Sequence, residues 1–179
     1  VMALISGTAR NASAEFGKKR GNFPYYKGSI YDRPETPYMR NATTTTIAPT
    51  GTISIIANCS SGVEPLFAVS YLRKVLNGNE LVEVQPLFKR MAKKRKLFST
   101  ALIKDISKTG SVQHLEKIPD DLKRLFVTSH DTAPEWHIGI QAAFQKFTDN
   151  AVSKTVNFPA NATVKDVEKV YRMAYEYGC

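Results

Sequence analysis

Apolar residues recur with helical spacing in several parts of the chain and predict amphipathic helices there. Residues 1–20 are rich in alanine and end in a basic cluster before Gly21, which is typical of a helix that stops at this glycine. Residues 86–98 begin with a proline, which suits the first position of a helix. A further short helix is expected to begin at Pro119, because two acidic residues follow it in the first turn.

Two more helices are predicted toward the C-terminus from their capping residues. Thr132 and Glu135 have the spacing of a capping box, and Thr163 is expected to cap the last helix. On the first of these helices, one apolar stripe is formed by Trp136, Ile140, Phe144 and Phe147. On the last helix, the residues expected to face inward are Val164, Val167, Val170, Tyr171 and Ala174.

Strands are indicated where β-branched residues cluster. Residues 43–57 carry them on both sides of a Pro/Gly break, which fits either strand–turn–strand or a strand, a loop and a short helix starting near Thr52. Spacing does not separate these alternatives in such short runs. Residues 152–158 are a second candidate strand, whereas residues 21–42 form a long irregular connection. The mixed order of helices and strands predicts an α/β fold.

The composition is that of a globular protein, with 179 residues of which 42% are hydrophobic and 23% charged. One domain is expected at this length, disordered and fibrous classes are excluded, and no apolar stretch approaches the roughly 18 residues of a membrane span. The 25 Lys and Arg residues against 16 Asp and Glu give a net charge of +9, which favours anionic partners such as nucleotides, nucleic acid or a membrane surface. Cys59 and Cys179 match neither a disulfide framework nor a zinc motif, so a reducing cytoplasm is the expected compartment.

The segment from Thr50 to Ser54 is the part of the chain best suited to binding a ligand. Gly51 allows a ligand to approach the backbone closely, and successive N–H groups that open a helix can cradle phosphate oxygens. Thr50, Thr52 and Ser54 add hydroxyl groups. The segment lacks the lysine of a Walker A loop and is therefore not an ordinary NTPase site. The alternative interpretation is a plain turn between two strands.

Two other clusters of polar residues have simpler explanations. Residues 89–96 hold six positive charges in eight positions, which fits either a grip on a phosphate backbone or a solvated helix face. No metal site is predicted, because the spacing of two nearby histidines differs from the common i, i+4 arrangement of helical zinc ligands. The residues in question are His130, Asp131, Glu135 and His137.

Three blocks of the sequence, residues 40–68, 129–159 and 162–179, resemble adenosylcobalamin-dependent (class II) ribonucleotide reductase. The first contains Ile47-Ala48-Pro49-Thr50-Gly51-Thr52-Ile53-Ser54 and Ser60-Ser61-Gly62-Val63-Glu64-Pro65. The second contains Gln141-Ala142-Ala143-Phe144-Gln145-Lys146 and Val152-Ser153-Lys154-Thr155-Val156-Asn157-Phe158-Pro159. The resemblance spans nearly the whole chain.

This resemblance implies a partial ten-stranded α/β barrel, with residues 1–179 as a single, incomplete domain from the C-terminal part of the catalytic barrel. The implied activity is conversion of ribonucleotides to deoxyribonucleotides by thiyl-radical chemistry, with adenosylcobalamin as cofactor and a thioredoxin-like reductant. The implied substrate is a ribonucleoside diphosphate or triphosphate. Its phosphates would be bound by Thr50, Gly51, Thr52 and Ser54, which favours the loop-to-helix alternative.

The chain departs from the family pattern at its cysteines. The family's radical cysteine is followed two positions later by a glutamate, whereas Glu64 lies five positions after Cys59, and Cys179 does not match a redox thiol. No catalytic residue is therefore assigned to this chain, and the remainder of the polypeptide is expected to supply them. A class I enzyme with an external radical generator is an alternative within the family, and a small basic nucleic-acid-binding module is an alternative outside it.

The absence of the radical motif predicts that the isolated chain has no reductase turnover, even with cobalamin and a dithiol. The measurement is the amount of deoxynucleotide formed, compared with a reaction that lacks the protein. Deoxynucleotide above that background would contradict the prediction.

Overall fold

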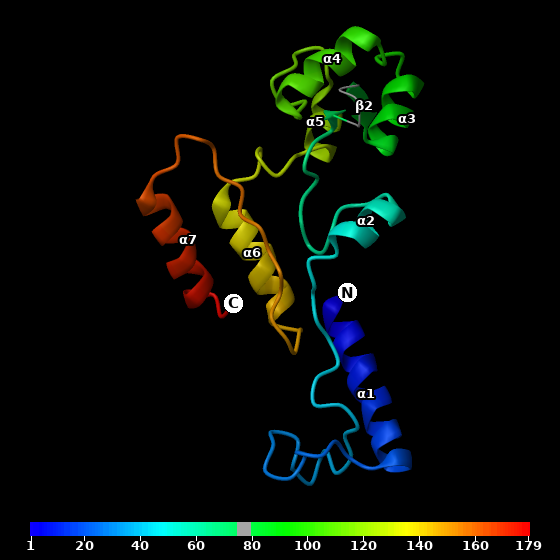
Figure 1. Cartoon of the computed structure of the whole chain (residues 1–179), viewed down its shortest axis with the longest axis vertical. Helices are drawn as coiled ribbons and strands as arrows, with labels where there is room; N and C mark the ends of the chain where they lie inside the picture. The colour runs from blue at the N-terminus through cyan, green and yellow to red at the C-terminus, as the bar shows by residue number, and fades with distance from the viewer. Residues whose placement is uncertain (75–79) are drawn as a thin grey trace.

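The computed structural model describes residues 1–74 and 80–179, which form an elongated, mixed helix and strand structure (Figure 1). The helix α1 lies toward one end of the long axis, whereas α3, α4, α5 and the two strands form a compact group at the other end. The helices α6 and α7 pack against each other between these ends. The elements are α1 (Met2–Arg20), α2 (Gly51–Ala57), β1 (Ser70–Lys74), β2 (Glu80–Val84), α3 (Pro86–Lys94), α4 (Thr100–Thr109), α5 (Asp120–Leu125), α6 (Pro134–Gln145) and α7 (Val164–Glu176).

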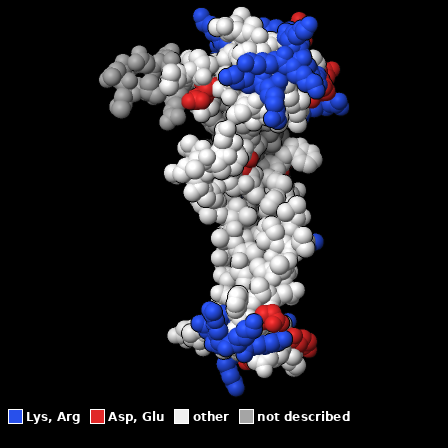
Figure 2. Space-filling model, turned by 90° about the vertical axis from the view of Figure 1, so that its right-hand side faces the viewer, with Lys and Arg blue, Asp and Glu red and all other residues white. Residues whose placement is uncertain are grey.

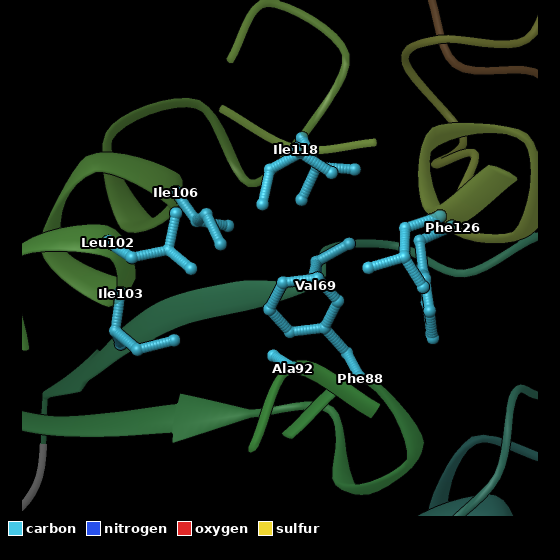
Figure 3. Close-up of a cluster of buried hydrophobic side chains, with 10 residues drawn as sticks. Val69, Phe88, Ala92, Leu102, Ile103, Ile106, Ile118 and Phe126 are labelled. Atoms are coloured by element: carbon cyan, nitrogen blue, oxygen red, sulfur yellow. The ribbon is translucent and has the colours of Figure 1, made fainter. Parts of the chain in front are cut away.

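The compact group is built on one hydrophobic cluster, which we call the Val69–Phe126 core (Figure 3). Phe88 and Phe126 meet edge to face, with ring centroids 5.1 Å apart. Side-chain caps fix the starts of two of its helices, because Gln85 accepts from the Phe88 N–H and Ser99 accepts from the Leu102 N–H. The buried members of the core are Val69, Phe88, Ala92, Leu102, Ile103, Ile106, Val112, Ile118, Leu122 and Phe126.

An antiparallel pair of strands, β1 and β2, lies against this core, and neither these strands nor α4 was expected from the sequence. Ser70 pairs with Val84 at one end of the ladder. The Ser70 hydroxyl donates to the Glu83 carbonyl at 2.9 Å and lies 2.9 Å from the Ser107 hydroxyl of α4. An Asn77-Gly78 pair in the sequence is the signal that could have predicted two paired strands, and it lies outside the described residues.

Extended segments from distant parts of the chain meet as isolated parallel bridges. Ile47 pairs with Val152, and Leu66 pairs with Thr128. Residues 43–57 form an extended segment, a loop and the helix α2, so the loop-to-helix alternative is confirmed. The predicted strand over residues 152–158 is wrong beyond Val152, because only one bridge pairs it with a neighbour among the described residues. Within residues 1–74 and 80–179 the sheet has two strands, and no closed barrel is present.

The predicted helices are confirmed, although the start of α6 and the buried faces of α6 and α7 differ from expectation. Thr163 and Asp166 form the capping box of α7. The capping box expected at Thr132 is wrong, because α6 begins one residue later, with Ala133 as its N-cap. The Thr132 hydroxyl instead donates to the Thr128 carbonyl at 2.9 Å, and Glu135 pairs with Lys169 of α7 at 2.5 Å.

The apolar faces of α6 and α7 are more exposed than their helical spacing suggests. Trp136 is 74% exposed and Tyr171 76% exposed, so these residues do not face a core in this chain. Val164 is also exposed, whereas Val170 and Ala174 are half-buried. The inward-facing assignment is therefore wrong for most of the α7 residues, because α6 covers only part of the α7 surface. Among the described residues, no helix is long and apolar enough to cross a membrane.

The carboxylate of Asp149 connects α1 to the extended segment at Thr44 through hydrogen bonds. Asp149, whose side chain is 6% exposed, accepts from Arg10 at 2.7 Å and from both the N–H and the hydroxyl of Thr44. The Asp149 N–H in turn donates to the Thr45 hydroxyl at 3.0 Å. Burial alone would raise the pKa of Asp149, but the hydrogen bonds from Arg10 and Thr44 outweigh it and lower the pKa to about 2.

The Val69–Phe126 core predicts a large loss of stability for Phe88→Ala. We expect the free energy of unfolding to fall by about 3–5 kcal/mol, because a fully buried ring is replaced by a cavity. The measurement is denaturant unfolding. The neighbouring Leu87→Ala is the matched control and should cost about 1 kcal/mol or less, since Leu87 is 37% exposed. Equal losses for the two variants would contradict the assignment of this core.

The Asp149 contacts predict an acid-dependent stability. Replacement of Asp149 by Asn is expected to lower the free energy of unfolding at neutral pH by about 2 kcal/mol, because a pKa near 2 lies well below the unfolded value near 3.8. This contribution is present above about pH 4 and is lost as the pH falls through about 2, so the two proteins should converge there. Urea unfolding as a function of pH measures it. Asp105→Asn, which removes an exposed partner of Lys108 and Lys117, is the control and should change little.

Candidate functional site

The predicted phosphate loop lies where an extended segment turns into α2. Ile47 pairs with Val152, and the chain then passes through Ala48 and Pro49 to Thr50, the N-cap of the helix. Thr50 has a φ of 52°, in the left-handed region that is rare for a β-branched residue. Such a conformation needs support from its surroundings, since it costs of order 1–3 kcal/mol.

That support comes from the turn at Ser61 to Glu64, which lies beside the loop. The Gly62 N–H donates to the Thr50 hydroxyl at 2.8 Å. Gly62 itself has a φ of 48°, and a Cβ on it would lie 3.3 Å from the Ala48 carbonyl oxygen. A glycine is therefore needed at this position, both for its backbone conformation and for its close approach to the loop.

Gly51, the first residue of α2, has open surroundings. It is exposed, no described heavy atom lies within 4 Å of the place a Cβ would take, and its φ is outside the left-handed region. Neither the fold of the backbone nor packing within the described residues explains a glycine here. The open side of Gly51 instead leaves room for a ligand to approach the backbone.

The first turn of α2 presents backbone donors to this space. The N–H groups of Gly51, Thr52 and Ile53 have no partner within the helix, as at any helix start, and the Thr50 side chain does not cap them. The first turn contains no acidic residue. An anion placed there would meet these donors and the positive end of the helix dipole.

The hydroxyl groups of the loop are in different situations. Thr52 is exposed and borders the open space, whereas the Thr50 oxygen already accepts from Gly62. Ser54 is buried, and its hydroxyl donates to the Gly51 carbonyl at 2.7 Å. Ser54 thus stabilises the helix start in this structure, and its predicted contact with phosphate stays a prediction.

A buried lysine connects the loop to the C-terminal part of the chain. Lys154 has a fully buried side chain, and its ammonium lies 2.5 Å from Glu64 Oε2. The other carboxylate oxygen, Glu64 Oε1, accepts from the Thr155 N–H at 2.7 Å. Lys154 also donates to the Thr155 carbonyl and lies 2.8 Å from Nδ1 of His137.

His137 completes this group, which we call the Lys154 cluster (Glu64, His137, Lys154 and Thr155). Because an ammonium can only donate, Nδ1 of His137 accepts, and Nε2–H donates to the Ser129 carbonyl at 3.0 Å. Burial lowers the pKa of His137; the bond to Ser129 opposes this shift, and the charge of Lys154 supports it. The imidazole is therefore neutral at pH 7 and serves as an acceptor for the lysine.

The sequence did not indicate the Lys154 cluster. From the sequence, His137 is considered only as a metal ligand, a role that its spacing does not support, and Lys154 falls within a predicted strand. The available signal was a lone lysine within a run of mostly short and apolar residues, because a charge there needs partners when the run is buried.

The residues considered as metal ligands are dispersed. His130 packs edge-on against Phe67, with ring centroids 5.9 Å apart, and Asp131 accepts from Ser111 and Thr128. Within residues 1–74 and 80–179, no group of three or more His, Cys, Asp or Glu side chains is arranged to hold a metal ion. Cys59 and Cys179 are both free and exposed.

The basic run lies on the compact group at one end of the molecule. Figure 2 shows Lys and Arg side chains gathered toward both ends of the long axis, with a stretch of few charges between them on the face drawn. Arg95 makes a bidentate pair with Asp121, at 2.9 and 2.6 Å. All six cations of the run are exposed: Lys89, Arg90, Lys93, Lys94, Arg95 and Lys96. A solvated helix face accounts for this arrangement.

This chain is similar to known proteins over its whole length. The family model described as "Ribonucleotide reductase, barrel domain" matches residues 1–179. A vitamin B12-dependent ribonucleoside-diphosphate reductase of Thermoplasma acidophilum is 45% identical over 179 residues, which is 100% of this chain and 23% of that protein. A protein of the same name from Mycobacterium tuberculosis is 40% identical over 176 residues, or 98% of this chain and 25% of that protein.

Among solved structures, a class Id ribonucleotide reductase alpha subunit of Actinobacillus ureae matches with a TM-score of 0.80 and 25% identity. The match covers 99% of this chain and 31% of that subunit. The chain thus spans about a quarter of the length of its curated relatives. The alternative of a small nucleic-acid-binding module finds no support in these comparisons. The resemblance inferred from the sequence is confirmed, and the chain belongs to the ribonucleotide reductase barrel-domain family.

Proposed function

We propose that this chain is part of the catalytic barrel of a vitamin B12-dependent ribonucleoside-diphosphate reductase and that its loop from Thr50 to Ser54 binds the phosphates of the substrate. The names of the relatives at 40–45% identity support the reaction, the cofactor and the choice of a diphosphate. The open first turn of α2 supports the position of the phosphates.

The proposed phosphate site rests mainly on the environment of Gly51. Glycine is a poorer helix former than alanine, and here it relieves no clash and adopts no special conformation. Close approach of a ligand explains it. A phosphate oxygen at this point would accept from the N–H groups of Gly51 and Thr52, with the exposed Thr52 hydroxyl as a further donor.

The remaining parts of the reaction are assigned to the rest of the reductase polypeptide. These are the radical cysteine, the cysteine pair that delivers electrons, and the contact with a thioredoxin-like reductant. Adenosylcobalamin supplies the radical when it is bound, and His137 does not offer it a ligand, because both ring nitrogens are already engaged within the described part of the chain. The free, exposed state of both cysteines agrees with the reducing cytoplasm proposed as the setting.

The proposal predicts that Gly51→Ala in the full-length reductase weakens substrate binding without loss of stability. The added methyl group would occupy the open space in front of the first-turn N–H groups, so we expect KM for the ribonucleoside diphosphate to rise about tenfold or more. The melting temperature should stay the same or rise, because alanine is the better helix former. Steady-state kinetics and thermal unfolding measure the two quantities.

Gly7→Ala is the matched control, because Gly7 is also helical, exposed and free of atoms within 4 Å of a Cβ, but lies in α1. It should leave KM unchanged. Thr52→Val, which removes only the exposed hydroxyl, should raise KM for the diphosphate and leave binding of the nucleoside without phosphates unaffected. Native KM values for both Gly51→Ala and Thr52→Val would overturn the assignment of the phosphate loop.

A further inference from the structure

The ammonium of Lys154 is fully buried and has an acceptor for each of its three hydrogens. These acceptors are Glu64, Nδ1 of His137 and the Thr155 carbonyl. Removing a charge from water is costly, and it is tolerated only when every donor finds a partner. Such a group is well suited to fix the relative positions of the segments that supply its partners.

We propose that Lys154 is a positioning residue for substrate binding: it holds Glu64, and through the turn at Ser61 to Glu64 it sets the conformation of Thr50 at the start of the phosphate-binding helix. This inference rests on the proposed function of the loop. The side chain of Lys154 is itself fully buried, and its ammonium is engaged by Glu64, His137 and Thr155, so it does not contact the substrate phosphates.

Glu64 is held at both of its carboxylate oxygens. Oε2 accepts from Lys154 and Oε1 accepts from the Thr155 N–H. The two donors belong to consecutive residues, so the carboxylate is fixed in position and in orientation. The backbone at Glu64 is thereby attached to the segment that follows Val152.

The phosphate loop is attached to this same segment from its other side. Ile47 pairs with Val152, and the Ser153 N–H donates to the Ile47 carbonyl at 2.9 Å. The residues that precede the loop and the turn that follows α2 are therefore both attached to residues 152–155. A shift of Glu64 away from Lys154 would break the attachment of the turn, while the pairing of Ile47 with Val152 would remain.

The turn that contains Glu64 also contacts the start of α2. Gly62, two residues before Glu64, donates to the Thr50 hydroxyl at 2.8 Å. Thr50 adopts a left-handed conformation that costs free energy for a β-branched residue and persists only when its surroundings support it. If Glu64 lost its contact with Lys154, residues 61–64 would be free to move. Thr50 could then leave its left-handed conformation, and the N–H groups at the start of α2 would no longer point in a common direction.

His137 contributes by fixing the lysine. Its neutral ring accepts from Lys154 on one side and donates to the Ser129 carbonyl on the other. The residue is 1% exposed and lies on α6, so the helix provides a rigid support for the cluster. Hydrogen bonds, together with the backbone from Gly62 to Glu64, therefore link the phosphate loop to α6.

The test uses Lys154→Met, Glu64→Gln and the double variant in the full-length reductase. Lys154→Met keeps the length of the side chain and removes its donors, and we expect KM for the diphosphate to rise about tenfold while kcat changes less than about threefold. Binding of the nucleoside without phosphates should not change. The rise in KM of the double variant should be smaller than the product of the rises in the two single variants. In Lys154→Met alone the Glu64 carboxylate is left without its cation, whereas in the double variant a neutral amide replaces that carboxylate.

Lys169→Met is the matched control, since Lys169 pairs with Glu135 at the same 2.5 Å but on the surface, where its side chain is 62% exposed. It should have the native KM. A purely structural role of Lys154 would lower the melting temperature and the yield of active enzyme but leave KM unchanged, and that result would overturn the inference. If Lys154→Met does not fold, Glu64→Gln carries the same test, with a raised KM expected and a native KM overturning it.

The Thr52→Val variant separates this inference from the proposed function. A native KM in Thr52→Val together with a native KM in Gly51→Ala means that the loop does not bind phosphate, and both proposals fail. A raised KM in these loop variants with a native KM in Lys154→Met and Glu64→Gln means that the loop binds substrate without help from the lysine. Only the role of Lys154 is then overturned.

Discussion

The buried ammonium of Lys154 joins parts of the chain that lie far apart in the sequence. Glu64 lies beyond the end of α2, His137 lies on α6, and Lys154 itself follows the bridge between Ile47 and Val152. The ammonium constrains the geometry of this junction, because each of its N–H donors requires an acceptor of its own in a dry environment. The arrangement of the loop around α2 depends on those acceptors being in place.

The candidate site combines a supported backbone with an open face. Thr50 is held in an uncommon conformation by Gly62, and Gly62 in turn is close to the Ala48 carbonyl. Beyond them, Gly51 and Thr52 are exposed, and no described residue fills the space beside Gly51. Rigid support behind a site and open donors in front of it allow an anion to bind without a large cost for ordering the loop.

The Val69–Phe126 core has a different basis. Its members all lie within residues 69–126, and their side chains are apolar. Gly110 ends α4 in the left-handed conformation and approaches Ala68, where a Cβ would lie 2.9 Å from the alanine methyl group. A single stretch of the chain therefore supplies this core, whereas the Lys154 cluster joins Glu64 to a lysine 90 positions further along the chain.

The sequence by itself determined most of the helices and the family, because these depend on local spacing, capping residues and contiguous motifs. Thr163 with Asp166 is one such local signal, and the Thr50–Ser54 segment is another. Spacing left the structure of residues 43–57 open, and only the family resemblance favoured a loop that leads into a helix. Only the tertiary structure decided that the extended run after Val152 pairs at a single bridge within the described residues, that Trp136 is exposed, and that Lys154 meets its partners Glu64 and His137. The physical reason is that burial and ion pairing depend on which distant segments come together, and the local pattern of one sequence does not contain that information.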